Sequence, residues 1–207
     1  FGIAIGASVL IALDIIDEYG GFWNALRYSF FQVSSLMTTT GFATADFTLW
    51  PAFSKSILVL VMIIGASAGS TGGGLKVSRV IIFFKAWVQE IGRQLSPRRT
   101  SNVRVNGRTL PAATLHNTLV FIGLYFLLTF VITAVVSLDG YDLETTLASV
   151  ISCMSNVGPG LGPAGPMGNF DIFSDLSKVL LSFAMLAGRL EIFPMLILFA
   201  PATWRRR

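Results

Sequence analysis

The feature that most constrains this chain is a pair of apolar runs long enough to cross a lipid bilayer. Leu119 to Leu138 carries no charge, and Val179 to Ala200 is interrupted only by Arg189 and Glu191. A membrane-spanning helix needs about 20 mostly apolar residues. Charged residues make up 13% of the chain, against roughly 25% in a soluble domain. The sequence therefore predicts an all-α membrane protein.

The placement of charge predicts the orientation of the chain. Eleven of the 15 basic residues lie in residues 76–108 and in the tail 205–207. Basic residues near membrane helices stay on the cytoplasmic side, so we expect both segments there. Residues 92–108 contain no aromatic side chain to stack on a base, so topology explains this charge better than nucleic-acid binding does. The opening at Phe1, without a basic leader, is expected to be a cut within a longer protein.

An internal repeat organises the sequence. Residues 53–58 match residues 176–181 at an offset of 123. Further upstream, residues 37–41 match residues 154–158 at an offset of 117. Each copy reads as an apolar run, a short amphipathic run, a small polar segment with Gly, and a second apolar run. Repeats in a membrane protein suggest a pathway where the copies meet.

The repeat divides the chain into two units. We expect one pore repeat in residues 1–95, a cytoplasmic linker in residues 96–111, and a second pore repeat with a short basic tail in residues 112–207. Each unit would contain a helix, a re-entrant pore helix, a filter segment and a second helix.

The short run in each copy predicts a re-entrant helix. Trp23–Met37 and Leu143–Met154 are too short to span a bilayer. Thr38–Phe42 and Ser155–Pro159 follow them, and non-helical backbone at membrane depth is tolerated only where it is shielded or faces water. Gly lets successive carbonyls turn toward one axis, where they can replace the hydration shell of a cation. An ordinary Thr/Gly turn is the alternative, and two copies at matching positions disfavour it.

These segments supply the candidate filter residues. They are Thr39, Thr40, Gly41, Phe42, Asn156, Val157, Gly158 and Pro159, with the cation expected at the backbone carbonyls of Thr40, Gly41, Val157 and Gly158.

A glycine-rich stretch, Gly65 to Gly74, interrupts the long segment from Ser54 to about Gln94. Each Gly costs a helix roughly 1 kcal/mol relative to Ala, so five in ten residues predict a break. We expect a flexible intramembrane loop that lies under the filter and gates it. A phosphate-binding loop is disfavoured, because Leu75 separates the glycines from Lys76 and no Ser or Thr follows that lysine. The candidate gate residues are Gly69, Ser70, Thr71, Gly72, Gly73, Gly74 and Arg189.

Arg189 lies near the middle of the last apolar run. A central Arg costs about 2.5–3.5 kcal/mol on insertion scales, so its side chain should face the bundle interior. It would either meet carbonyls of the glycine-rich loop and form a gate, or pair with an acid on a helix elsewhere. Glu191, two residues away, does not share its helix face.

Several of these motifs resemble the Trk/Ktr/HKT superfamily of potassium transporters. The resemblance covers nearly the whole chain in order. It is carried by residues 38–42, 68–77, 156–162, 188–193 and 201–205. It implies one potassium-channel-like pore built from four repeats, of which this chain would be the third and fourth. Gly41 and Gly158 would then be filter glycines, and Arg189 would face the gating loop.

The resemblance also implies partners and a location. These are the first two repeats of the same pore, a second copy in a homodimer, membrane lipid, and a cytoplasmic nucleotide-binding ring of the TrkA type. Nucleotide would bind that ring, so no cofactor is expected in this chain and potassium is its substrate. The location would be the inner membrane of a bacterium. The alternatives are a membrane-embedded enzyme or nucleotide-binding subunit, and a non-conducting scaffold subunit. The sequence shows no constellation of catalytic residues that would support the first of these. We expect no enzymatic activity.

Overall fold

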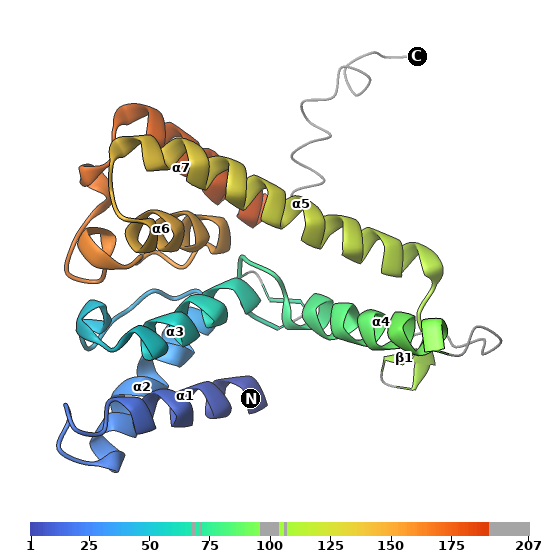
Figure 1. The fold of residues 1–207 in the computed structure, drawn as a ribbon, viewed down its shortest axis with the longest axis horizontal. Helices are drawn as coiled ribbons and strands as arrows, with labels where there is room; N and C mark the ends of the chain where they lie inside the picture. Colours follow the sequence, from blue (N-terminus) through green and yellow to red (C-terminus); the bar gives the residue numbers. More distant parts are fainter. Residues whose placement is uncertain (68, 71, 96–103, 106, 191–207) are drawn as a thin grey trace.

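The computed structural model describes residues 1–67, 69–70, 72–95, 104–105 and 107–190, and this part of the chain is mostly helical (Figure 1). In chain order the elements are α1 (Gly2–Asp14), α2 (Phe22–Met37), η1 (Phe47–Leu49), α3 (Ala52–Ile64), α4 (Val77–Leu95), β1 (Arg104–Val105), β2 (Arg108–Thr109), α5 (Ala112–Val136), η2 (Ser137–Asp139), α6 (Leu143–Ser155), η3 (Gly162–Ala164), η4 (Phe170–Ile172) and α7 (Asp175–Leu190).

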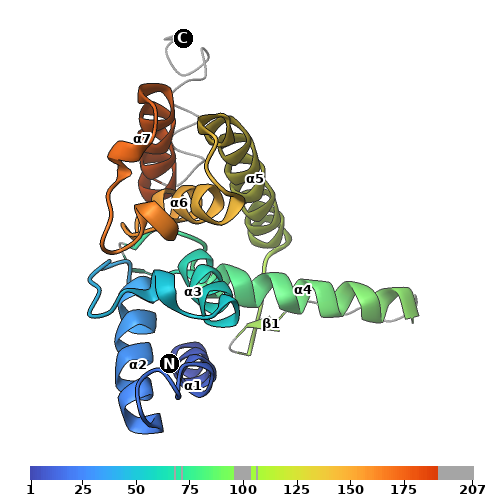
Figure 2. The same ribbon diagram turned by 60° about the vertical axis from the view of Figure 1, so that its left-hand side comes forward.

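The helices form two groups of the same order. In the first, α1 packs against α2 and α3; in the second, α6 and α7 pack against each other and against α5. The two groups meet where α3 contacts α6, as Figures 1 and 2 show. The short helices predicted around residues 23–37 and 143–154 are confirmed as α2 and α6.

Two buried apolar clusters hold these groups. One centres on Ile11, Leu36 and Leu58 and also takes in Ala148 and Leu161 from the second group. The other surrounds Tyr125 and the end of α6. Because the first cluster crosses from one group to the other, the α3–α6 contact is part of the core.

One helix of the described chain is long and apolar enough to cross a membrane, Ala112–Asp139, which matches the prediction for residues 119–138. Its outward side carries large exposed apolar side chains, among them Phe130, which is 67% exposed. Such a surface suits lipid better than water. Of the run predicted at residues 179–200, the structure describes the part up to Leu190 within α7.

The predicted helix break is confirmed. α3 ends at Ile64, Gly65 takes a positive φ of 62°, and the next helix begins at Val77. From there α4 runs beside part of α5 and away from the rest of the bundle (Figure 2). The linker contains a short hairpin, β1–β2, that the sequence did not predict.

Carboxylates fix where helices begin. The Asp142 carboxylate accepts a hydrogen bond from the Thr145 backbone N–H at 3.1 Å and starts α6. At the end of α1, Asp14 Oδ2 accepts hydrogen bonds from the Ser54 N–H and hydroxyl, at 3.2 and 2.6 Å. The bonds from the Thr145 and Ser54 N–H groups each satisfy a backbone donor that the first turn of a helix leaves unpaired.

Candidate functional site

The segments that follow α2 and α6 are built by the same hydrogen bonds. The Thr40 N–H donates to the Ser35 carbonyl at 2.9 Å, and the Val157 N–H donates to the Ser152 carbonyl at 2.9 Å. The two bonds join positions related by the offset of 117. We call residues 38–42 the first Gly segment and residues 155–159 the second Gly segment.

The backbone angles of the two segments also match. Thr39 and Gly41 have φ values of 58° and 78°, and Asn156 and Gly158 have φ values of 55° and 117°. Thr39 and Asn156 are the two non-glycine residues with positive φ in the described chain. Positive φ at alternate residues gives the two segments the same course of the backbone. This is the kind of geometry with which a row of main-chain oxygens can surround an ion.

The two Gly segments lie against each other. A Cβ on Gly41 would overlap with the carbonyl oxygen of Val157, and it would stand 3.2 Å from Cδ of Pro159. Both segments also line one open hollow of about 420 Å³. Its lining residues are Gly41, Phe42, Ala43, Gly158, Pro159 and residues 164–168 and 170. The repeat therefore brings the predicted filter positions together in space.

The glycine-rich loop, residues 65–74, packs against both segments. A Cβ on Gly72 would lie 3.1 Å from Oγ1 of Thr39. A Cβ on Gly73 would overlap with the Ser155 carbonyl oxygen. At Gly73 only glycine allows the two backbones to approach so closely, whereas at Gly72 the contact is tight. Of the predicted gate residues, Thr71 lies outside the described chain.

Hydrogen bonds close the loop on itself. The Leu75 N–H donates to the Ile63 carbonyl at 2.9 Å, and the Val77 N–H donates to the Ala66 carbonyl at 3.1 Å. The end of α3 and the start of α4 are therefore tied together across the break, although the helix does not continue through it.

The second Gly segment is held from α5 and α7. Asn156 Nδ2 donates to the Met185 carbonyl on α7 at 2.9 Å. The Tyr125 hydroxyl of α5 lies 3.0 Å from Oγ of Ser155. Tyr125 is buried, so this bond is shielded from water. Tyr125 was not predicted as a site residue from the sequence. Its one signal there is a single tyrosine within an uncharged apolar run.

Arg189 is exposed near the end of the described part of α7. Its neighbour Gly188 packs against the same turn of α6 as the loop does, because a Cβ there would overlap with the Met154 carbonyl. Gly188 and the loop thus both pack against the end of α6. The gating role of Arg189 stays a prediction, and Glu191 lies outside the described chain.

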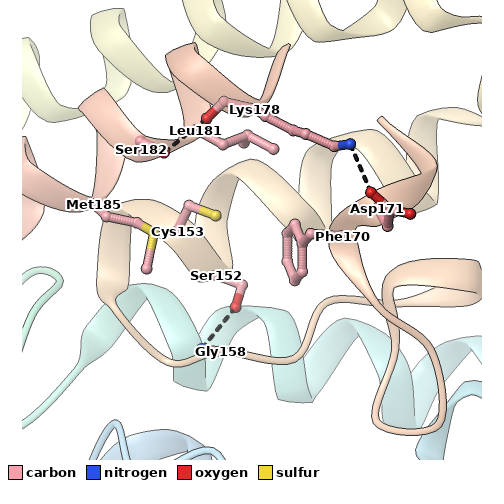
Figure 3. A pocket seen from close by; sticks show the side chains of 9 residues that line it. All are labelled: Ser152, Cys153, Gly158, Phe170, Asp171, Lys178, Leu181, Ser182 and Met185. Atoms are coloured by element: carbon pink, nitrogen blue, oxygen red, sulfur yellow. Dashed lines mark hydrogen bonds and ion pairs between the residues drawn. The ribbon is translucent and has the colours of Figure 1, made fainter. Parts of the chain in front are cut away.

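Behind the second Gly segment lies a hollow of about 480 Å³ between α6, α7 and η4 (Figure 3). Gly158 reaches it, and its N–H donates to Ser152 Oγ at 3.1 Å. At one edge Lys178 Nζ lies 2.7 Å from Asp171 Oδ1. The hydrogen bond and the positive charge of Lys178 hold the pKa of the Asp171 carboxyl below its usual range.

Comparison with known proteins identifies the family. Residues 23–206 match the family model TrkH, described as a cation transport protein. The Trk system potassium uptake protein TrkH of Salmonella typhimurium is 37% identical over 187 residues, which is 90% of this chain and 38% of that protein. The corresponding TrkG of Escherichia coli is 35% identical over 208 residues, which is 98% of this chain and 42% of that protein.

Comparison with a solved structure supports the same family. The crystal structure of the potassium transporter TrkH from Vibrio parahaemolyticus superposes with a TM-score of 0.88 at 32% identity, and the match covers 99% of this chain and 44% of that one. The chain spans about two fifths of the length of these curated relatives, 38% and 42% for the two described above. The relatives are named as transporters and not as enzymes. With its fold and most of its length matched, the chain belongs to the TrkH family of cation transport proteins.

Proposed function

We propose that this chain forms half of a pore for potassium uptake across a bacterial inner membrane. The named relatives are potassium uptake proteins, and this chain spans less than half of each. The activity is therefore proposed for the longer transporter to which the chain contributes. Two further repeats of the same polypeptide would complete a ring of four around the ion.

The observation that carries this proposal is the contact of Gly41 with the Val157 carbonyl. It places two equivalent backbone turns side by side at the ends of two short helices. The C-terminal end of a helix carries a partial negative charge, which favours a cation nearby. Potassium would be held by the carbonyl oxygens of Thr40, Gly41, Val157 and Gly158, and no cofactor would be needed.

The glycine-rich loop would gate this path from the cytoplasmic side. Its contacts with Thr39 and Ser155 support the role, because a loop that touches both Gly segments can transmit its movement to both. Arg189 would add a fixed positive charge that raises the barrier for a cation. We further propose a homodimer and a cytoplasmic nucleotide-binding ring as partners, with residues 96–111 and the C-terminus facing that ring.

Ion flux tests the proposal. The longer transporter, reconstituted in liposomes, is expected to take up rubidium, and potassium should compete more strongly than sodium. A transporter that is folded and inserted but passes no rubidium, with or without the regulatory ring, would contradict conduction. It would favour the scaffold alternative.

A further inference from the structure

One buried serine of α6 holds two consecutive peptides of the second Gly segment. The Ser152 carbonyl accepts a hydrogen bond from the Val157 N–H at 2.9 Å, and the Ser152 hydroxyl accepts one from the Gly158 N–H at 3.1 Å (Figure 3). No part of Ser152 is exposed. Because both of its oxygens are engaged with neighbouring N–H groups, Ser152 fixes the orientation of both peptides.

The hydroxyl bond sets the direction of one carbonyl that we propose as an ion ligand. The Val157 carbonyl and the Gly158 N–H belong to the same peptide unit, and in a trans peptide these two groups point in opposite directions. The bond to Ser152 therefore turns the Val157 carbonyl away from α6. There it meets the first Gly segment, where its oxygen takes the space of a Cβ on Gly41. The Ser152 hydroxyl thus aims this carbonyl at the place where the two segments meet.

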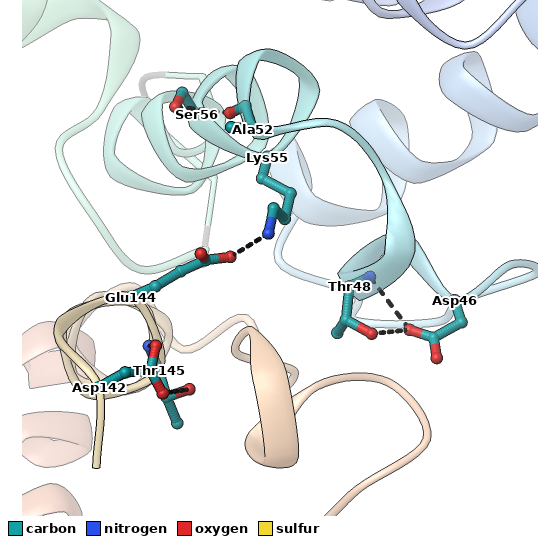
Figure 4. A network of polar contacts seen from close by, with 8 residues as sticks. All are labelled: Asp46, Thr48, Ala52, Lys55, Ser56, Asp142, Glu144 and Thr145. Atoms are coloured by element: carbon teal, nitrogen blue, oxygen red, sulfur yellow. Dashed lines mark hydrogen bonds and ion pairs between the residues drawn. The ribbon is translucent and has the colours of Figure 1, made fainter.

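The helix that presents Ser152 is fixed at its other end (Figure 4). In the first turn of α6, Glu144 Oε1 lies 2.6 Å from Lys55 Nζ of α3, and Asp142 caps the helix through the Thr145 N–H. Ser152 lies about two helical turns further along α6. These contacts tie α6 to the first helix group without involving the hydroxyl of Ser152, so a change at this hydroxyl alters the bond to Gly158 and leaves the anchoring of the helix intact.

The first copy contains the equivalent serine without the equivalent bond. Ser35 corresponds to Ser152 at the offset of 117, and its carbonyl accepts the Thr40 N–H at 2.9 Å. The next donor, the Gly41 N–H, lies 3.5 Å from that same carbonyl, at the weak end of hydrogen-bond geometry. The buried Ser35 hydroxyl has no hydrogen-bond partner within the part of the chain that the structure describes. The peptide between Thr40 and Gly41 is therefore held less firmly than its counterpart in the second copy.

We propose that Ser152 is a positioning residue for ion selectivity, and that the second Gly segment is the more rigid of the two because of its hydroxyl. A carbonyl that is held from behind does not move inward to shorten its contact with a cation smaller than potassium, such as sodium. The first Gly segment, without this bond, adapts more readily. The inference rests on the proposed pore, and it adds a residue outside the filter that sets the preference between the two ions.

Selectivity of the longer transporter, measured in liposomes, tests the proposal. Rubidium uptake is inhibited with potassium and with sodium, and the ratio of the two inhibition constants reports the preference. S152A removes the bond to Gly158, and we expect the preference for potassium to fall at least about fivefold while rubidium uptake continues. S152T keeps a hydroxyl and should keep the preference. A wild-type ratio in folded S152A would overturn the proposal.

Two further variants keep the test decisive. S35A makes the same deletion at the equivalent place in the first copy, where the hydroxyl forms no bond in the described chain, so the ratio should stay within about twofold of wild type. An equal fall in S35A and S152A would overturn the assignment to the hydroxyl bond. S152C fills the space of the hydroxyl with a poor acceptor, and it should lose the preference as S152A does even where S152A folds badly.

A purely structural role and a failure of the pore itself give different results. E144Q breaks the ion pair at the other end of α6, and it should lower the melting temperature without changing the ratio of inhibition constants. If S152A and E144Q lower the melting temperature alike and both keep the wild-type ratio, Ser152 only stabilises the fold and the proposal is wrong. Absence of rubidium uptake in the wild type would instead contradict the proposed function.

Discussion

The carbonyl oxygen of Val157 occupies the space that a side chain on Gly41 would need. Gly41→Ala therefore combines an overlap with an unfavourable positive φ, whereas Gly158→Ala meets open space and carries the backbone penalty alone, about 1–2 kcal/mol. We expect Gly41→Ala to abolish rubidium uptake and Gly158→Ala to reduce it, with loss of potassium over sodium preference. Equal, normal uptake by both variants would remove the filter assignment.

The close approach of Gly73 to Ser155 can be tested in the same way. Gly73 does not have a positive φ, so Gly73→Ala tests the contact and not backbone strain. The added methyl should push the loop away from the second Gly segment and raise basal rubidium flux in the absence of the regulatory ring. Gly123→Ala, in a helix with open space around it, is the control. A fall in basal flux in folded Gly73→Ala would reverse the assignment of the loop as a barrier.

The hydrogen bond between Tyr125 and Ser155 predicts a link between stability and gating. Tyr125→Phe removes it and should cost about 1 kcal/mol, measured as a lower melting temperature in detergent. Tyr141→Phe removes a comparable bond, to the Ile172 carbonyl at 2.9 Å, away from the loop. We expect both variants to lose stability and only Tyr125→Phe to change basal flux. The same flux in both would limit Tyr125 to a structural role.

Arg189 is predicted to raise the barrier for cations. Arg189→Ala should increase rubidium leak when the regulatory ring is absent or inactive, because a fixed positive charge is lost. Arg189→Lys should keep most of the barrier, and Arg93→Ala on α4 controls for the loss of a basic residue elsewhere. Leak unchanged in folded Arg189→Ala would leave the loop as the gate on its own.

Asp142 predicts a pH dependence of stability. The Thr145 hydroxyl and backbone N–H hold the pKa of the Asp142 carboxyl below its usual value of about 3.9. Because this pKa is lowered in the folded state, the stabilisation is present above about 3.9 and is lost as pH falls through the folded pKa. Asp142→Asn should melt below the wild type at pH 7, and the two curves should converge in acid. A difference in melting temperature that stays constant with pH would show that the negative charge of Asp142 does not contribute to capping α6.

Structural features that depend on neighbouring residues in the chain could be predicted from the sequence, and features that depend on the packing of distant segments could not. The helix break follows from the glycines between Ile64 and Val77, and the spanning helix follows from uncharged apolar length, so both were predicted. The Gly segments were found because the repeat marks them twice. The contact of Gly41 with Val157 could not be predicted from either copy, since it depends on how α3 packs against α6.

Other features lacked a sequence signal at all. Lys55 and Glu144 stand far apart in the chain, and nothing in composition pairs them. The bond from Asp14 to Ser54 likewise joins two helices through packing. The repeat does not predict the pair either, because Lys178, at the position equivalent to Lys55, pairs with Asp171.

Gly65 and Gly188 occupy equivalent places in the two copies, but α3 stops just before the first while α7 continues past the second. The 13 residues of α3 reach about 20 Å, short of the roughly 30 Å of hydrocarbon. In the proposed pore, the helix would thus be broken at Gly65 in the first copy and continuous through Gly188, as far as Leu190, in the second. Two copies of one sequence therefore need not behave alike: in the proposed pore, the loop after α3 could move while the corresponding part of α7 stays helical, so one repeat of the four would respond to a cytoplasmic partner.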